Sequence, residues 1–186
     1  SQLGLPNPLI YYAHGDYDYY YDLAQKHQHV IDACITVSQA QAKKMKLCVP
    51  VLAEKTRCIY FPVPAAAASN PKVKGSVIFI GRLSDTKGYD VLVQMAQKLS
   101  AEVKLNWHVI GEGEPAYLEK IKWPDDVDVK HYGQLANKEV QNILSKMEIL
   151  VLPSMREGMP NVVIEAMKAA VVPLVSNIEG GVQELI

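Results

Sequence analysis

The chain has 186 residues, 49% of them hydrophobic, and a formal net charge of −1 at pH 7. This length allows one domain, or one domain and part of another, with enough apolar side chains for a core. The balanced charge lacks the basic footprint of a polyanion-binding protein, so no nucleic acid is expected as a partner. The cysteines Cys34, Cys48 and Cys58 lack paired or metal-type spacing and indicate reduced thiols in a cytoplasmic protein.

The first third of the chain predicts a partial α/β domain with little helix. Apolar runs predict three short strands, at residues 8–13, 31–37 and 57–61. Ser38 followed by Gln41 matches a capping box and predicts a short basic helix through Lys46. A polar segment rich in tyrosine separates the first two strands. The prolines and alanines of residues 62–71 predict a linker to the next domain.

From Ser76 onward, strands alternate with amphipathic helices. The predicted strands are residues 77–80, 105–110, 127–131, 149–152 and 172–175, and the predicted helices are residues 89–99, 138–147 and 161–170. This alternation predicts a Rossmann-like parallel sheet with helices on both faces. A further helix is expected after Gly180-Gly181. Because it could not complete a few turns before Ile186, we expect the chain to be a piece of a longer protein.

Apolar side chains at helical spacing predict which face of each helix meets the sheet. The three stripes are Leu92, Met95, Ala96 and Leu99; Val140, Ile143, Leu144 and Met147; and Val163, Ala166, Met167 and Ala170. In the last helix, Asn161, Glu165 and Lys168 lie on the opposite side. On spacing alone, this polar side is interpreted as a solvated face with a Glu165–Lys168 pair.

Two carboxylates follow the predicted strand 149–152. Gly158 and Pro160 turn the chain into the helix 161–170. Glu157 lies on the loop and Glu165 about one turn into the helix. Both carboxylates can therefore face one crevice at the carboxyl end of the sheet, where open α/β sheets bind ligands.

Two cations follow another strand of the same sheet. Gly81-Arg82 comes directly after residues 77–80, and Lys87 precedes the next helix. Arg82 offers a bidentate fork and Lys87 a point charge, which with free amides suit a diphosphate. Alone, this pattern is weak, because cations near helix starts are usually solvated. Combined with two carboxylates that can accept hydrogen bonds from sugar hydroxyls, it predicts a nucleotide-sugar site.

Three other features have competing interpretations. A G-x-G-x-x-A pattern begins at Gly111, but Glu112 and Glu114 would repel a pyrophosphate, which favours a strand-to-helix turn. Residues 16–18 (Asp-Tyr-Asp) resemble a metal-nucleotide motif without a nearby third acidic partner, which favours a polar loop. His14 closes a predicted strand in a position suited to a ligand contact, although a lone histidine is usually structural.

Several ordered motifs carry a family resemblance. They are Gly81-Arg82-Leu83 with Lys87-Gly88, Glu157-Gly158-Met159-Pro160 with the E-x7-E spacing to Glu165, and Gly180-Gly181. They resemble the retaining glycosyltransferases of family four, which have the two-lobed GT-B fold. Residues 10–14 resemble the acceptor-lobe strand that ends in the family's active-site histidine. The resemblance implies that residues 1–64 are the C-terminal part of the N-terminal (acceptor) lobe, 65–75 a linker, and 76–186 the nucleotide-sugar-binding lobe, truncated before its last helices.

The resemblance also implies a role for each site residue. Glu157 and His14 would lie at the reacting centre. The diphosphate would be bound by Gly81, Arg82 and Lys87; the sugar and ribose by Glu157, Gly158, Met159, Pro160, Asn161 and Glu165; and the base by backbone groups near Gly133. Family members need neither a metal ion nor a cofactor, and their donors are nucleotide sugars such as UDP- or GDP-hexose. The cations stabilise the departing diphosphate, and front-face attack retains the anomeric configuration.

The resemblance thus implies a fragment of a cytoplasmic bacterial enzyme of polysaccharide biosynthesis that transfers a hexose to a glycan or lipid-linked acceptor. The full-length protein would associate peripherally with the membrane through its missing N-terminal lobe. The fragment is expected to be inactive, because a two-lobed cleft needs both walls. The alternatives are a GT-B-like sugar-nucleotide epimerase and a non-catalytic binding or scaffold module. Ala170 departs from the family's usual glycine, and alanine in a left-handed helix cap costs about 1 kcal/mol.

Overall fold

The computed structural model describes residues 7–63 and 70–186. The described chain forms two compact units, each discontinuous in sequence. The first unit comprises residues 7–62, Arg156–Pro160 and Asn177–Ile186, and the second comprises residues 63, 70–155 and Asn161–Ser176. Residues 65–69 of the predicted linker lie outside the described residues.

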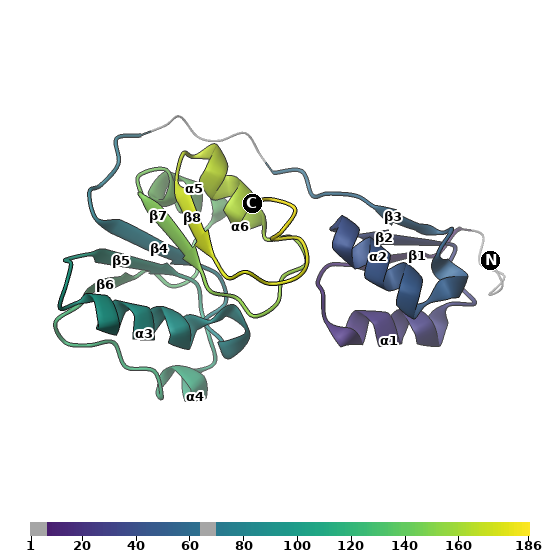
Figure 1. Cartoon of the computed structure of the whole chain (residues 1–186), viewed down its shortest axis with the longest axis horizontal. Helices are drawn as coiled ribbons and strands as arrows, with labels where there is room; N and C mark the ends of the chain where they lie inside the picture. Colours follow the sequence, from purple (N-terminus) through teal and green to yellow (C-terminus); the bar gives the residue numbers. More distant parts are fainter. Residues whose placement is uncertain (1–6, 64–69) are drawn as a thin grey trace. The chain divides into compact units, whose positions relative to one another are not determined.

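A five-stranded parallel sheet forms the centre of the second unit (Figure 1). Its strands, in the spatial order β6-β5-β4-β7-β8, are β6 (Asp128–His131), β5 (Asn106–Ile110), β4 (Ser76–Ile80), β7 (Ile149–Leu152) and β8 (Val172–Val175). Every neighbouring pair is parallel, which requires a crossover connection between successive strands. The structure confirms the predicted α/β fold with helices on both faces of a parallel sheet.

The helices of the second unit cover the two faces of this sheet. Figure 1 shows α3 (Tyr89–Leu99) and α4 (Pro115–Leu118) on one face, and α5 (Asn137–Leu144) and α6 (Asn161–Lys168) on the other. The predicted stripe of α3 is confirmed, because Leu92 and Ala96 are buried and Met95 and Leu99 pack partly buried against the same core. This burial is the main source of stability for a helix of this length.

The prediction for the apolar stripe of α6 is partly wrong. Val163 and Ala166 are buried as predicted, but Met167 is 47% exposed and Ala170 is also exposed. Ala169 is buried instead. The helix ends at Lys168, two residues before the predicted end, so the chain leaves helical periodicity before it reaches Ala170.

Ala170 is the only non-glycine residue with a positive φ in the described parts of the chain, at 54°. A left-handed alanine is strained, whereas glycine adopts this conformation without a Cβ clash. We expect Ala170→Gly to stabilise folding by about 0.5–1 kcal/mol, after the greater unfolded-state entropy of glycine is subtracted. Urea unfolding of the purified chain measures the difference.

The control for Ala170→Gly is Ala53→Gly. Ala53 has an ordinary right-handed φ of −53°, so glycine there relieves no strain and is expected to destabilise. A decrease in stability for both variants would contradict the strain that we assign to Ala170.

A three-stranded parallel sheet, β1 (Ile10–Ala13), β2 (Ala33–Thr36) and β3 (Thr56–Cys58), forms the first unit together with α1 (Asp18–His27), α2 (Gln39–Cys48) and a 3₁₀ turn. The predicted cap of α2 is confirmed, because the Ser38 hydroxyl accepts a hydrogen bond from the Gln41 N–H at 3.1 Å. The Gln41 side chain accepts from the Val37 N–H rather than from Ser38. The second hydrogen bond of the capping box therefore comes from the backbone of Val37, one residue before the N-cap residue Ser38.

Helix α1 contradicts the prediction of little helix in this region. Its N-cap residue, Tyr17, makes no side-chain cap, and only Tyr21 and Ala24 of the helix are buried. Polar and aromatic residues with this weak pattern give little local helix signal. Tertiary contacts supply the missing stability, because the Tyr21 hydroxyl donates to Asp16 and the Lys44 ammonium lies 3.0 Å from the same carboxylate.

The helix predicted after Gly180-Gly181 does not form within the described residues. Residues 179–185 make successive turns, with i to i−3 hydrogen bonds from the N–H groups of Gln183 and Leu185. The Glu184 carboxylate instead accepts hydrogen bonds from the backbone N–H groups of Gln39 and Ala40, at 3.1 and 2.8 Å, within the first unit. This charge-assisted contact at the N-terminus of α2 stabilises residues 179–185 as turns in place of the predicted helix.

Candidate donor-binding site

The loops that carry the predicted site residues of the second unit follow neighbouring parallel strands. Strand β4 lies between β5 and β7, so the carboxyl ends of the three strands share one edge of the sheet. Gly81 and Arg82 follow β4, Gly111 follows β5, and Pro153 follows β7. The fold thus brings together loops that are far apart in the sequence.

A buried leucine holds the loop after β4. Leu83 is 4% exposed, and its N–H donates to the Glu112 carbonyl at 2.8 Å, whereas the neighbouring Arg82 is exposed. A Cβ on Gly111 would lie 1.9 Å from the Gly81 carbonyl oxygen, and one on Gly113 would lie 2.2 Å from that of Leu83. The two glycines therefore allow close contact between the β4 and β5 loops.

The loops after β4 and β7 also touch each other. The Met155 N–H donates to the Thr86 carbonyl at 2.9 Å. Gly88 has a left-handed φ of 69°, and a Cβ there would lie 2.0 Å from the Pro153 carbonyl oxygen. The segment that carries Lys87 is therefore packed directly against the start of the loop that leads to Glu157.

The rest of this loop belongs to the first unit, where Gly158 packs against the end of β1. A Cβ on Gly158 would lie 2.9 Å from the Cα of Gly15 and 3.0 Å from the His14 carbonyl oxygen, and one on Gly181 would lie 2.0 Å from the Gly158 carbonyl oxygen. The Glu157 side chain is only 7% exposed, and Met159 and Pro160 are buried. The structure thus packs Gly158 against the backbone of the exposed His14, and it buries the neighbouring Glu157.

The start of α6 carries two further predicted residues in the second unit. The Oδ1 atom of Asn161 is buried and has no hydrogen-bond partner among the described residues. Glu165 is partly buried, and this burial raises the pKa of its carboxyl, although a hydrogen bond with Gln141 opposes the shift. The interpretation of this side of α6 as a solvated face is therefore wrong for Glu165. The Lys168 ammonium donates to the Val63 carbonyl at 2.6 Å.

The raised pKa of Glu165 predicts a pH-dependent stability. Folded Glu165 keeps its proton at pH values where the unfolded chain has lost it, so its contribution to stability is complete below the unfolded pKa, 4.5, and is lost as the pH rises through the folded pKa. We expect Glu165→Gln, which stays neutral, to unfold at a higher temperature than the wild type at pH 7. The difference should vanish at acidic pH.

Thermal unfolding at several pH values measures this effect, with Glu102→Gln as the control. Glu102 lies exposed in a turn, so its neutralisation is expected to leave the unfolding temperature unchanged. A lower unfolding temperature for Glu165→Gln at pH 7 would contradict the assigned cost of burial.

Gly133, the predicted base-binding position, follows β6 with a φ of 67°. A Cβ there would meet no atom within 4 Å, so the backbone conformation, not close packing, requires glycine. Beside it, the Tyr132 hydroxyl lies 2.8 Å from His108 Nδ1, and the Lys130 ammonium lies 4.9 Å from the centre of the Tyr132 ring. Burial, reinforced by Lys130, lowers the pKa of His108.

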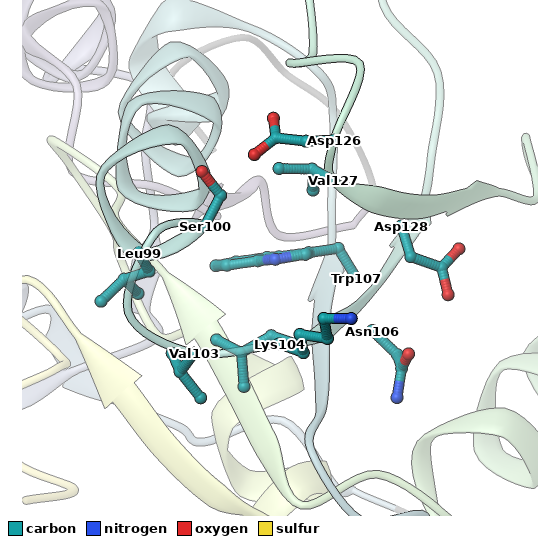
Figure 2. Close-up of a pocket in the computed structure, with 10 residues that line it drawn as sticks. Leu99, Ser100, Val103, Lys104, Asn106, Trp107, Asp126, Val127 and Asp128 are labelled. Atoms are coloured by element: carbon teal, nitrogen blue, oxygen red, sulfur yellow. The ribbon is translucent and has the colours of Figure 1, made fainter.

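A cavity of about 390 Å³ borders Arg82 at the carboxyl edge of the sheet. Its other lining residues include Thr86, Glu114 and Tyr117. A larger cavity, of about 500 Å³, is lined in part by Trp107 and lies at the opposite edge, where β5 and β6 begin (Figure 2). The larger cavity therefore lies at the opposite edge of the sheet from the predicted cations, and the smaller cavity is lined by one of them, Arg82.

Residues 7–63 and 70–186 contain no group of three or more His, Cys, Asp or Glu side chains arranged to hold a metal ion. In the same described residues, every helix is too short or too polar to cross a membrane.

Comparison with known proteins identifies the family. The family described as glycosyl transferases group 1 matches residues 74–186. An uncharacterized 41.2 kDa protein in the cps region of Klebsiella pneumoniae is 30% identical over 115 residues, which is 62% of this chain and 31% of that protein. The Escherichia coli UDP-Gal:alpha-D-GlcNAc-diphosphoundecaprenol alpha-1,3-galactosyltransferase is 34% identical over 74 residues, 39% of this chain and 19% of the enzyme. The chain thus spans about a third or less of the length of these relatives.

A solved structure shares the fold. The crystal structure of a mutant of Staphylococcus aureus TarM, in complex with fondaparinux, alpha-GlcNAc-glycerol and UDP, superposes with a TM-score of 0.79 at 19% identity. The match covers 96% of this chain and 38% of TarM, and similar structures are GT-B glycosyltransferases. With the family match over residues 74–186, these findings show that the chain belongs to the group 1 glycosyltransferase family.

Proposed function

We propose that this chain is part of a retaining glycosyltransferase of family four that transfers a hexose from a nucleotide diphosphate sugar to a glycan or lipid-linked acceptor. The contact between the β4 and β7 loops carries the proposal. It joins the segment of Arg82 and Lys87 to the start of the loop that continues to Glu157 and, through α6, to Glu165. The segment with the cations thus touches the first residues of the loop after β7, Pro153 and Met155.

Under this proposal, different residues bind the diphosphate, the sugar and ribose, and the base of the donor. Arg82 and Lys87, with the backbone of Gly81, bind the diphosphate, because a guanidinium fork and an ammonium match its charge. Glu157 and Glu165 accept hydrogen bonds from the sugar and ribose hydroxyls. The backbone amides of residues 158–161 hold the sugar or phosphate, and the backbone near Gly133 contacts the base. The presence of UDP in the TarM crystal and of UDP-Gal in the name of the E. coli relative favours a UDP-sugar.

The transfer step needs no metal ion or cofactor in this mechanism. The bond between the anomeric carbon and the donor phosphate oxygen breaks, and the acceptor oxygen attacks the same face of the sugar. The acceptor proton passes to the leaving phosphate, so no side chain is required as a base. Arg82 and Lys87 stabilise the negative charge that develops on the diphosphate, and His14 lies near the reacting centre.

The two ends of the chain take different parts in this enzyme. Residues 1–64 belong to the acceptor lobe, residues 65–75 to the linker, and residues 76–186 to the donor lobe. The complete protein acts in the cytoplasm, at the membrane face where its N-terminal lobe brings it to a lipid-linked acceptor. This chain alone is expected not to turn over, because it holds only part of the acceptor wall.

Calorimetric titration with UDP and GDP tests the proposal. We expect one of the two nucleotides, UDP, to bind to this chain. The absence of binding by both would favour a scaffold, and binding without sugar transfer by the full-length protein would favour an epimerase-like relative. Robust transfer by the 186-residue chain would contradict the requirement for a complete acceptor lobe.

A further inference from the structure

Three aromatic rings of the first unit, Tyr12, His14 and Phe61, form an aromatic cluster. The Tyr12 and His14 rings stack with centroids 4.3 Å apart and planes at 29°. Phe61 lies 5.7 Å from His14 with nearly parallel planes, at 16°. The Tyr12 and Phe61 centroids are also 5.7 Å apart. The two separations of 5.7 Å fall in the range of favourable aromatic pairs, and the Tyr12–His14 pair is slightly closer than that range.

The cluster depends on both strand alternation and tertiary structure. Tyr12 and His14 are two residues apart along β1 and its end, so they lie on the same face of the sheet. Phe61 comes three residues after β3, which is separated from β1 by β2. The Ile59 N–H donates to the Thr36 carbonyl at 2.9 Å, which holds the chain beside the end of β2 before it reaches the other two rings.

The three distances show a triangle and not a sandwich. If His14 were sandwiched between the other two rings, the Tyr12–Phe61 distance would equal the sum of their distances to His14. The Tyr12–Phe61 distance is instead the same as the His14–Phe61 distance, 5.7 Å. Tyr12 therefore covers one face of the imidazole, and Phe61 adjoins both rings. The His14 side chain is otherwise exposed.

Stacking is the contact that holds the His14 ring. The imidazole stacks on Tyr12, and Phe61 lies nearly parallel to it. A histidine that acts in a site is usually oriented by a hydrogen bond at one nitrogen. In this chain the two aromatic neighbours restrict the plane of the His14 ring.

We propose that Tyr12 and Phe61 are positioning residues that orient His14 toward the reacting sugar and acceptor. The inference rests on the proposed function, because it takes His14 to lie at the reacting centre. Neither aromatic residue needs to touch the substrate for this role. The two rings limit rotation of the His14 imidazole in the free protein. Because of this, His14 loses less side-chain entropy when substrate binds.

The first experiment measures the His14 ring in this chain by NMR, and it needs no activity. The side-chain proton resonances, assigned with His14→Ala, are expected to move toward the positions of a solvent-exposed histidine in Tyr12→Leu and in Phe61→Leu, because the ring-current contributions are lost. Tyr12→Phe and Phe61→Tyr, which keep the rings, should leave them nearly unchanged. Unchanged resonances in both leucine variants would overturn the proposal.

The second experiment measures sugar transfer by the full-length protein. We expect kcat to fall about 10-fold in Tyr12→Leu, with the donor KM unchanged, as loss of an aromatic pair predicts. Tyr12→Phe should retain kcat within about twofold. If Tyr12→Leu lowers folded yield, Phe61→Leu provides the same test outside any strand. An equal loss of kcat in the leucine and phenylalanine variants of Tyr12 would overturn the positioning role.

A His14→Ala variant of the full-length protein separates this inference from the proposed function. Wild-type kcat in His14→Ala would refute the role of His14 at the reacting centre, and with it the positioning role, even if NMR shows that the two rings hold the imidazole. Loss of transfer in His14→Ala together with unchanged transfer in both leucine variants would refute the positioning role alone.

Discussion

Replacement of Arg82 with alanine is expected to weaken UDP binding to this chain by about 10- to 100-fold, which corresponds to the loss of one charge-assisted hydrogen-bonded contact. Lys87→Ala should act in the same direction. Uridine binding should change by less than about twofold, because the nucleoside carries no phosphate. Calorimetric titration of both ligands measures the two effects separately.

Two matched variants sharpen this prediction. Arg82→Lys keeps the charge but loses the bidentate fork, so its UDP affinity should lie between those of the wild type and Arg82→Ala. Lys98→Ala removes an exposed cation from the last turn of α3, at the opposite end of that helix from Gly88, and should leave UDP binding unchanged. Equal losses for UDP and uridine in Arg82→Ala would count against a diphosphate contact.

Gly88→Ala is expected to lower the free energy of unfolding by about 2–4 kcal/mol. The methyl group would lie 2.0 Å from the Pro153 carbonyl oxygen, so the loops after β4 and β7 would have to separate. The left-handed φ of 69° adds backbone strain for any side chain. UDP binding should also weaken, because the separation moves Lys87 away from the loop that leads to Glu157. Urea unfolding and calorimetry measure the two losses.

Gly75→Ala is the matched control for this steric effect. Gly75 has a similar φ of 71°, but the nearest atom to an added Cβ is 3.4 Å away. Its replacement should cost only the backbone strain, about 1–2 kcal/mol, and should leave UDP binding intact. If the two alanine variants lose the same stability and bind UDP equally well, the contact between the β4 and β7 loops does not shape the site as we infer.

The secondary structure of the second unit was largely predictable, because each element carries a strong local pattern. Strands β7 and β8 and helix α3 have the predicted bounds. The two strands are short apolar runs that end at Pro153 and Ser176, and α3 has a continuous apolar stripe. Helix α1 was missed, because Tyr21 and Ala24 are its only buried residues and its stability depends on contacts with Asp16 and Lys44 outside the helix.

The candidate site was predictable in composition but not in geometry. Residue type and strand-end position indicated Arg82, Lys87, Glu157 and Glu165, because cations match phosphate and carboxylates accept from hydroxyls. Their assigned roles stay predictions. The burial of Glu157 and the partial burial of Glu165 could not be predicted, since spacing on a loop or helix does not show what covers a side chain.

The sequence by itself determined the alternation of strands and helices, the parallel sheet and the loops where charged groups follow the strands, since these depend on local periodicity and chain direction. Tertiary structure alone decided that Gly88 lies against Pro153 and that Phe61 joins Tyr12 and His14. Such contacts join segments that are distant in the chain. These contacts depend on the order of the strands and on how closely the loops at the strand ends pack. A local sequence pattern contains no information about either property.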